Sequence, residues 1–344
     1  MKITSKLGYA IIGAIASVTF PLILMLLTGF ISPDFSRAYS SDIKGPQSQV
    51  NALCHGSIAL SQDPSDLLID YVYHNGKVQQ IWGLGVASLQ SLILCLIPIP
   101  DRIFLLVILI MLSFAVYWNV SKWVNKAQYH RVVAAIIGVC SVFVFVFLPA
   151  VVSLLRTRFL VYEETIYYGY LYAVFLFICS QMIIHSRRGA FLVGLLCGFA
   201  VMIRPTVLSY GIATLVVLLW RTPSYRLKRF LVYGFCIVGV IAAGLNWYRF
   251  GSPIEFGHTT NVSHDDVANT YQLKFDYAYK HESVISAGKE LFGALFYATP
   301  TVRGAYLSHK FPLQSDTVRW RAFYNYTFNP WYLGFFVVLC AAWW

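Results

Sequence analysis

Apolar runs of membrane-spanning length, separated by two long polar segments, constrain this chain more than any other feature. The polar segments cover 31–80 and 249–330, and the runs cover 8–30, 103–120, 131–153, 166–185, 206–220 and 230–248. A hydrocarbon core about 30 Å thick takes roughly 20 helical residues to cross. The pattern predicts an all-α polytopic membrane protein, a bundle of about eight transmembrane helices with two large extracytoplasmic loops.

The composition favours the same class of protein. Hydrophobic residues make up 58% of the chain and charged residues 12%, which is about half the charged fraction of a soluble domain. The net charge of +11 is dispersed as short basic clusters at the ends of the apolar runs, as in membrane proteins that set their orientation this way. A nucleic-acid-binding protein would gather these residues on one soluble face. We therefore expect no nucleic-acid partner.

The basic clusters predict the topology. The positive-inside rule places all of them on the cytoplasmic side only if the run 81–100 does not cross the membrane; they lie at Lys2 and Lys6, at 122–131, at Arg187 and Arg188, and at 221–229. We expect 81–100 to be a juxtamembrane or re-entrant helical segment, in agreement with its glycines and with Pro98 and Pro100. The runs 189–203 and 206–220 are then a hairpin, and all 15 acids face outward.

The chain is expected to have three parts. A transmembrane domain covers 1–248 and includes the first outer loop, 31–102. A second extracytoplasmic loop covers 249–330, and 331–344 is the start of a further transmembrane helix that is too short to span. The last run predicts that the sequence is truncated inside a helix.

Cysteine usage predicts little chemistry. Of the seven cysteines, all except Cys54 lie inside apolar runs, where a thiol acts as a small hydrophobic group. Cys54 lies in a polar segment and has no obvious partner. We expect neither a disulfide scaffold nor a zinc site.

The first candidate site residues follow the first apolar run. Asp34 and Asp42 lie just beyond it, with Arg37 and Lys44 within a few residues. A carboxylate beside basic groups at the membrane surface is suited to act as a general base toward a hydroxyl or amine, while the basic groups neutralise a phosphate. The alternative is a solvated, charged loop.

Two further candidates lie at predicted outer helix ends. Glu163 and Glu164 occur in the stretch VYEETIYYGY, whose tyrosines are typical of an interfacial belt, although the helix dipole also favours acids at this end. Arg204 lies between two apolar half-runs and is followed by Pro205. It either lines a cavity, where it would suit a lipid phosphate, or snorkels to the surface.

The second loop adds a basic residue and an ambiguous cluster. Arg249 directly follows an apolar run, and Gly251, Pro253 and Gly257 predict a turn. The spacing of His258, His264, Asp265 and Asp266 matches no established metal-ligand pattern. No cofactor is assigned, and a divalent cation is left open. The sequence has no phosphate-binding glycine loop, nucleophile elbow or HExxH helix.

Four stretches in a fixed order carry a resemblance to a known family. Asp42 precedes NALCHG, and Asp70 to Gly85 contains Asn75-Gly76-Lys77 and Trp82-Gly83; a glycine-containing run ends at Arg204-Pro205-Thr206, and NWYRFGSPIEFG covers Asn246 to Gly257. In this order the chain resembles the membrane-embedded glycosyltransferases of the C-type (GT-C) fold, such as the protein O-mannosyltransferases and the aminoarabinose transferase of lipid A, in an uncharacterised bacterial branch.

The resemblance implies an enzyme of the bacterial inner (plasma) membrane with its active site on the extracytoplasmic side. It would move a hexose or pentose from a polyprenyl-phosphate donor to a glycan, lipid or protein acceptor, in contact with membrane lipid. The resemblance maps the base onto Asp42, a further acid onto Glu163 or Glu164, and the lipid-phosphate contacts onto Lys44, Lys77, Arg204 and Arg249.

The chain departs from the family pattern after Asp42. Many relatives have an acidic pair followed by Arg-Tyr, whereas Ile43 and Lys44 follow here. The stretch Pro33-Asp34-Phe35-Ser36-Arg37 copies part of that signature instead, which makes Asp34 a rival base. The alternative function is a transporter, a lipid or polysaccharide flippase, or a polymerase without this transfer activity.

Overall fold

The computed structural model describes residues 2–27, 45–61, 71–81, 83–97, 101–127, 130–147, 161–183 and 186–257. All of them except Phe147 belong to one compact unit, Met1–Val146 with Arg158–Ala268. The second unit, Phe147–Thr157 with Asn269–Trp344, otherwise lies outside the described residues. The predicted boundaries at 249–330 and 331–344 therefore stay predictions.

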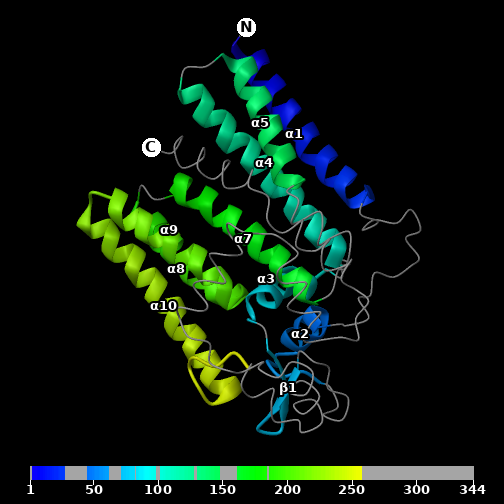
Figure 1. Ribbon diagram of the computed structural model, residues 1–344, viewed down its shortest axis with the longest axis vertical. Coiled ribbons are helices and arrows are strands. Elements are labelled where there is room, and N and C mark those ends of the chain that lie inside the picture. The colour runs from blue at the N-terminus through cyan, green and yellow to red at the C-terminus, as the bar shows by residue number, and fades with distance from the viewer. Residues whose placement is uncertain are drawn as a thin grey trace, which may run out of the picture. The chain divides into compact units, whose positions relative to one another are not determined.

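The helices follow the predicted apolar runs closely. They are α1 (Lys2–Leu27), α4 (Asp101–Lys126), α5 (Arg131–Val146), α7 (Val161–Ile183), α8 (Arg187–Ile203), α9 (Leu208–Arg221) and α10 (Tyr225–Phe250) (Figure 1). Within the described part of the chain, three of them, α1, α4 and α10, are long and apolar enough to cross a membrane. This identifies an integral membrane protein, with fewer clear spans than the about eight that the sequence predicts.

The predicted helical hairpin between 189 and 220 is present. Helix α8 ends at Arg204, whose backbone is extended, and Pro205 opens a single 3₁₀ turn, Pro205–Val207, before α9. Proline lacks the N–H that would continue a helix, so the chain turns here. Helices α8 and α9 then pack against each other.

Glycines set the packing of α8 against α10. A Cβ atom on Gly194 would lie 2.9 Å from the carbonyl carbon of Leu231 and nearer still to its oxygen. A Cβ on Gly198 would lie 2.8 Å from the carbonyl oxygen of Phe235, and one on Gly234 would lie 2.7 Å from the backbone nitrogen of Leu195. Small residues four apart let two membrane helices approach to backbone contact. The two helices are therefore packed too closely for side chains at these positions.

The described part of the polar segment before 81 contains a β-hairpin. Strands β1 (Tyr71–His74) and β2 (Lys77–Gln80) form an antiparallel hairpin. Asn75 and Gly76 join them with positive φ angles of 49° and 74°, which is the turn geometry that an Asn-Gly pair favours. A small core of Ala52, Leu60, Tyr71 and Val78 includes one residue from each strand.

The helix in the ambiguous run 81–100 is short. Helix α3 (Gly85–Leu94) has 10 residues, so it extends about 15 Å and cannot cross a bilayer. This agrees with the predicted non-crossing segment. Helix α3 packs on α2 (Gly45–Cys54) and on α8. Leu92 on the helix and Leu96 just after it are exposed.

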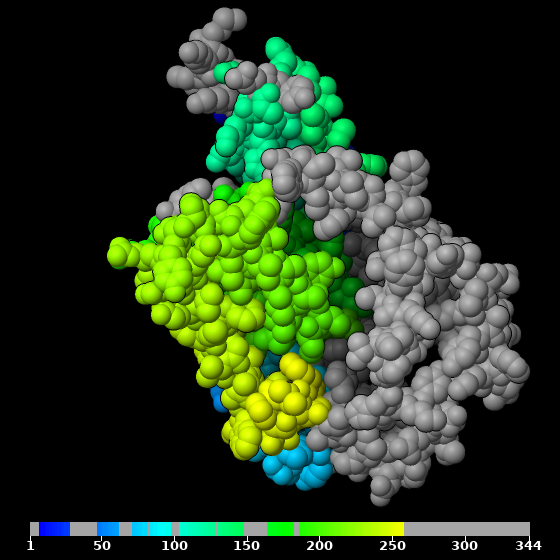
Figure 2. All heavy atoms as spheres, turned by 60° about the vertical axis from the view of Figure 1, so that its left-hand side comes forward, coloured from blue at the N-terminus to red at the C-terminus, as the bar shows by residue number. Residues whose placement is uncertain are grey.

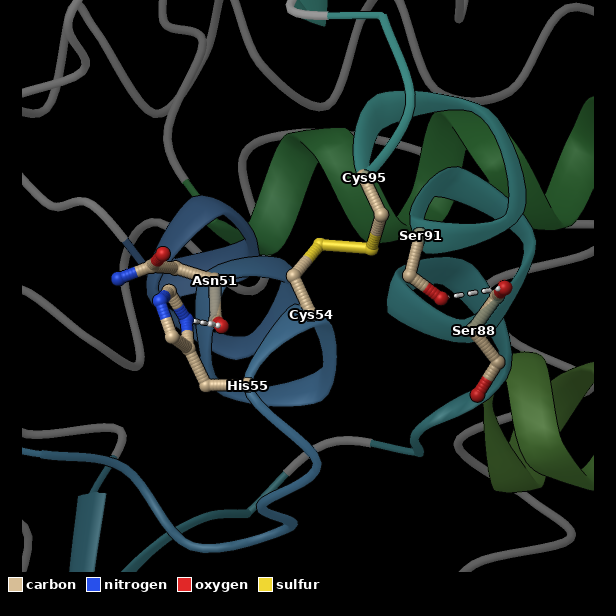
Figure 3. The surroundings of a disulfide bond; sticks show 6 residues. All are labelled: Asn51, Cys54, His55, Ser88, Ser91 and Cys95. Carbon is tan, nitrogen blue, oxygen red and sulfur yellow. Dashed lines mark hydrogen bonds between the residues drawn. A yellow bond between two sulfur atoms is a disulfide. The ribbon is translucent and has the colours of Figure 1, made fainter.

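The expectation that Cys54 has no partner is wrong. Cys54 forms a disulfide with Cys95, and their Cα atoms are 5.4 Å apart (Figure 3). Cys95 belongs to an apolar run, but α3 stops at Leu94, so the cysteine lies at the exposed end of a short helix. The sequence predicts a buried hydrophobic group at Cys95 because hydropathy does not show where, within the run 81–100, the helix ends.

Candidate functional site

The β1–β2 hairpin is attached to the end of α10 by a buried arginine. Arg249 is only 2% exposed. Its Nε donates a hydrogen bond to Gln79 Oε1 at 3.3 Å, and its Nη2 donates to the carbonyl oxygen of Gln80. The guanidinium carbon lies 4.6 Å from the centre of the Phe250 ring. Figure 2 shows the yellow end of α10 against the blue surface of the hairpin.

The turn that follows Arg249 keeps the chain close to the hairpin. Gly251 ends α10 with a left-handed φ of 73°, which glycine adopts without a Cβ penalty. A Cβ there would lie 3.7 Å from Nε2 of His74 in the hairpin, and one on Gly257 would lie 3.0 Å from Ile81. The predicted turn at 251–257 therefore packs against the β1–β2 hairpin and Ile81.

Lys77 is the exposed cation of this contact. Its Nζ donates to the hydroxyl of Tyr248 at 3.1 Å and lies 5.2 Å from the centre of that ring. Trp247 and Tyr248 are both more than half exposed at the end of a helix long enough to span. Aromatic rings at the ends of membrane helices are typical of the headgroup region, and Lys77 lies against one of these rings, that of Tyr248.

Arg204 lies where two of the singled-out stretches meet. A Cβ on Gly83 would lie 2.7 Å from the carbonyl carbon of Met202, and one on Gly85 would lie 2.6 Å from the same atom. Gly83 and Gly85 are therefore in backbone contact with the last turn of α8, two residues before Arg204. Arg204 itself is half-buried at the end of α8.

Glu164 is inside the protein. It is 5% exposed in the first turns of α7. Tyr168, one turn later on the same face, accepts a hydrogen bond from Nε2 of Gln90 in α3 at 3.0 Å. The neighbouring Tyr167 is also buried. Burial of a carboxylate costs free energy unless it is compensated, so Glu164 is not a surface charge. The side chain of Glu163 lies outside the described residues.

The interfacial belt expected for the α7 tyrosines is wrong. The hydroxyl of Tyr170 donates to the carbonyl oxygen of Phe145 in α5 at 3.2 Å, and that of Tyr172 donates to Leu196 in α8 at 2.6 Å. With Tyr168 against α3, these hydroxyl groups tie α7 to three neighbouring helices. Sequence alone does not show which face of a tyrosine-rich helix points inward.

The segment before and within α3 contacts the three helices that bear Arg249, Glu164 and the end before Arg204. Between 77 and 90 it touches the end of α10 at Arg249, the end of α8 before Arg204, and α7 one turn from Glu164. Asp34, Asp42 and Lys44 lie outside the described residues, as do His258, His264, Asp265 and Asp266. Within the described ranges, no group of three His, Cys, Asp or Glu side chains is placed to hold a metal ion.

Two of the contact residues were not singled out from the sequence. Gln79 accepts from Arg249, and Gln90 is a 1% exposed amide inside an apolar run. A polar residue in such a run needs a hydrogen-bond partner when it is buried. Gln90 within this apolar run was therefore the residue that could have indicated which face of α3 points inward.

Comparisons with protein-family models, with curated proteins and with solved structures found no match for this chain.

Proposed function

We propose that this chain is an integral membrane glycosyltransferase with a GT-C-like helical bundle. It transfers a sugar from a polyprenyl-phosphate donor to an acceptor at the extracytoplasmic face. One observation carries the proposal: residues 77–90 contact the helix ends that bear Arg249, Arg204 and Glu164. Stretches far apart in sequence, and noted for their resemblance to the GT-C enzymes, thus meet at one end of the helices.

The proposed reaction is an inverting transfer. Asp42, with Asp34 as its rival, removes the proton from an acceptor hydroxyl or amine. The acceptor atom attacks the anomeric carbon, the carbon–oxygen bond to the phosphate breaks, and polyprenyl phosphate leaves with the electron pair. Stabilisation of that leaving charge in a water-poor site supplies much of the rate.

In the proposed reaction, the charged residues of the helices and the hairpin have different roles. Lys77 is exposed and lies against Tyr248, and Arg204 is half-buried at a helix end. In this scheme both contact the lipid phosphate together with Lys44. Arg249 donates to Gln79 and Gln80, and in this scheme it holds the hairpin that carries Lys77. Glu163 or Glu164 orients the acceptor or the sugar from the start of α7.

The disulfide supports the extracytoplasmic assignment. Disulfides persist in oxidising compartments and are rare in the cytosol. The Cys54–Cys95 bond lies in the segment that bears Lys77. The same segment faces outward under the positive-inside rule, and the two arguments use different residues.

Sugar transfer in proteoliposomes tests the proposal. The purified chain would be mixed with a panel of polyprenyl phosphates that carry a radiolabelled hexose or pentose, and with extracted envelope lipids and glycans as acceptors. The expected result is a labelled acceptor that disappears in the double variant Asp42→Asn with Asp34→Asn. Asp66→Asn, in the same outer segment, is the matched control and should retain transfer.

Two results would count against the proposal. Full transfer by the double variant would exclude the assigned bases. Movement of the labelled lipid across the bilayer without a glycosylated product would favour the flippase or transporter. The charged residues of the described helices lie near helix ends, which does not suit a relay of charges through the membrane.

A further inference from the structure

The Cys54–Cys95 disulfide joins two helix ends in the first outer segment. Cys54 is the last residue of α2, and Cys95 is the C-cap of α3. Both cysteines are exposed, and the bond closes a loop of 41 residues that contains the β1–β2 hairpin. Figure 3 shows His55 turned toward Asn51, to whose carbonyl oxygen its ring is hydrogen bonded, rather than toward the sulfur atoms.

Both sulfur atoms lie at the ends of helices that carry a partial negative charge. The macrodipole places about half a negative charge at a helix C-terminus, so a thiolate is disfavoured at Cys54 and at Cys95. Reduction of a disulfide releases a thiolate, and a poorer leaving group departs more slowly. Reactive redox cysteines have the opposite placement, at helix N-termini. The geometry therefore favours a bond that persists once it has formed.

We propose that Cys54–Cys95 is a permanent structural disulfide, introduced by a thiol oxidoreductase on the extracytoplasmic face, and that this chain is a substrate of such an enzyme. One cysteine thiolate attacks the oxidoreductase disulfide and forms a mixed disulfide. The second thiolate then displaces the oxidoreductase, so the chain loses two protons and two electrons and the oxidoreductase becomes a dithiol. This inference does not depend on the transferase.

The bond has a topological consequence. Since Cys54 and Cys95 are joined, both lie on the same side of the membrane, and the chain between them crosses it an even number of times. The only helix described between them is α3, which is too short to cross. The disulfide thus fixes the hairpin and the start of the 81–100 run on the outer side, next to the end of α10.

Thiol trapping in cells tests the inference with the full chain. Cells are quenched with acid, free thiols are alkylated, and the peptides that contain Cys54 and Cys95 are identified by mass spectrometry before and after reduction. We expect one linked peptide pair in normal cells, and two alkylated thiols in cells that lack their extracytoplasmic thiol oxidoreductase. In Cys54→Ser, Cys95 should be alkylated in both strains.

A second measurement tests permanence. The purified, folded protein should keep the linked pair in dithiothreitol and lose it when unfolded in the same reductant. Two alkylated thiols in normal cells would overturn the whole proposal. Equal linkage in both strains would overturn the role of the oxidoreductase, and prompt reduction of the folded protein would overturn the permanent character of the bond.

Discussion

The close packing of α8 on α10 predicts a large effect from a single methyl group. In Gly194→Ala, the new Cβ would lie 2.9 Å from the carbonyl carbon of Leu231 and 3.1 Å from its Cα. Carbon atoms in contact prefer about 3.5–4.0 Å. The two backbones would have to move apart, because neither contact atom belongs to a flexible side chain. Overpacking of this kind costs about 1–3 kcal/mol.

Gly239→Ala is the matched control. Gly239 lies on α10, five residues beyond Gly234, and among the described residues its Cβ would meet no atom of another element within 4 Å. Alanine in a helix interior is more favourable than glycine by about 0.5–1 kcal/mol. The same gain applies to Gly194→Ala, which also lies inside a helix, so it cancels in the comparison, and the free energies of unfolding of the two variants should differ by about 1–3 kcal/mol. This corresponds to roughly 2–8 °C in the midpoint of thermal unfolding.

Thermal unfolding of the purified protein in nanodiscs, followed by tryptophan fluorescence, measures this difference. We expect Gly194→Ala to unfold at a lower temperature than the parent chain, and Gly239→Ala at the same or a higher temperature. A combination of Gly194→Ala with Gly234→Ala should cost less than the sum of the two, because both open the same contact. Equal midpoints for Gly194→Ala and Gly239→Ala would refute the packing argument.

Four further predictions follow from the described contacts. Arg249→Gln removes a charged donor from two hydrogen bonds and should cost about 1.5–3 kcal/mol per bond lost, with faster amide exchange across 71–80. Tyr168→Phe removes the acceptor of the Gln90 amide and should lower the free energy of unfolding by about 1–3 kcal/mol. Cys95→Ser opens a loop of 41 residues and should cost about 4 kcal/mol in the chain-entropy model. A cysteine at Lys126 should react with an impermeant maleimide from the cytoplasmic side alone.

Each of these has a control or a contrary outcome. Arg226→Gln, at the opposite end of α10, should leave exchange in 71–80 unchanged. Tyr233→Phe, at an exposed position on α10, should leave the free energy of unfolding unchanged. Unaltered stability of Cys95→Ser would show that the disulfide constrains nothing. Labelling at 126 from the outer side would show that the predicted orientation is inverted.

The helices were predictable because membrane-spanning segments carry a strong signal. A run of apolar residues interrupted by Arg204-Pro205 must turn there, and α8 and α9 do so. The short α3 was predictable from the balance of basic clusters across the membrane. Helix ends differed by up to several residues, as α10 begins at Tyr225 and not at 230, because a helix also includes polar residues that flank an apolar run.

The contacts between segments were not predictable in the same way. Two strands of four residues leave a weak pattern, and only Asn75-Gly76 marks the turn. The pairing of Cys54 with Cys95 and the attachment of Gln79 to Arg249 join residues that are 41 and 170 positions apart. Such partners depend on how α3 and α10 pack. The sequence predicted which stretches matter, and the fold shows which of them touch.

The central claim is that carboxylates and cations from separate stretches share one site at the outer membrane boundary. Cross-linking between Asp42→Cys and Glu163→Cys, with a short bifunctional thiol reagent in otherwise cysteine-depleted protein that keeps Cys54 and Cys95, tests it most directly. A shared site predicts an efficient intramolecular cross-link, and one to a cysteine at Lys126 should not form. The absence of any cross-link between positions 42 and 163, while both react fully with a monofunctional reagent, would contradict the account.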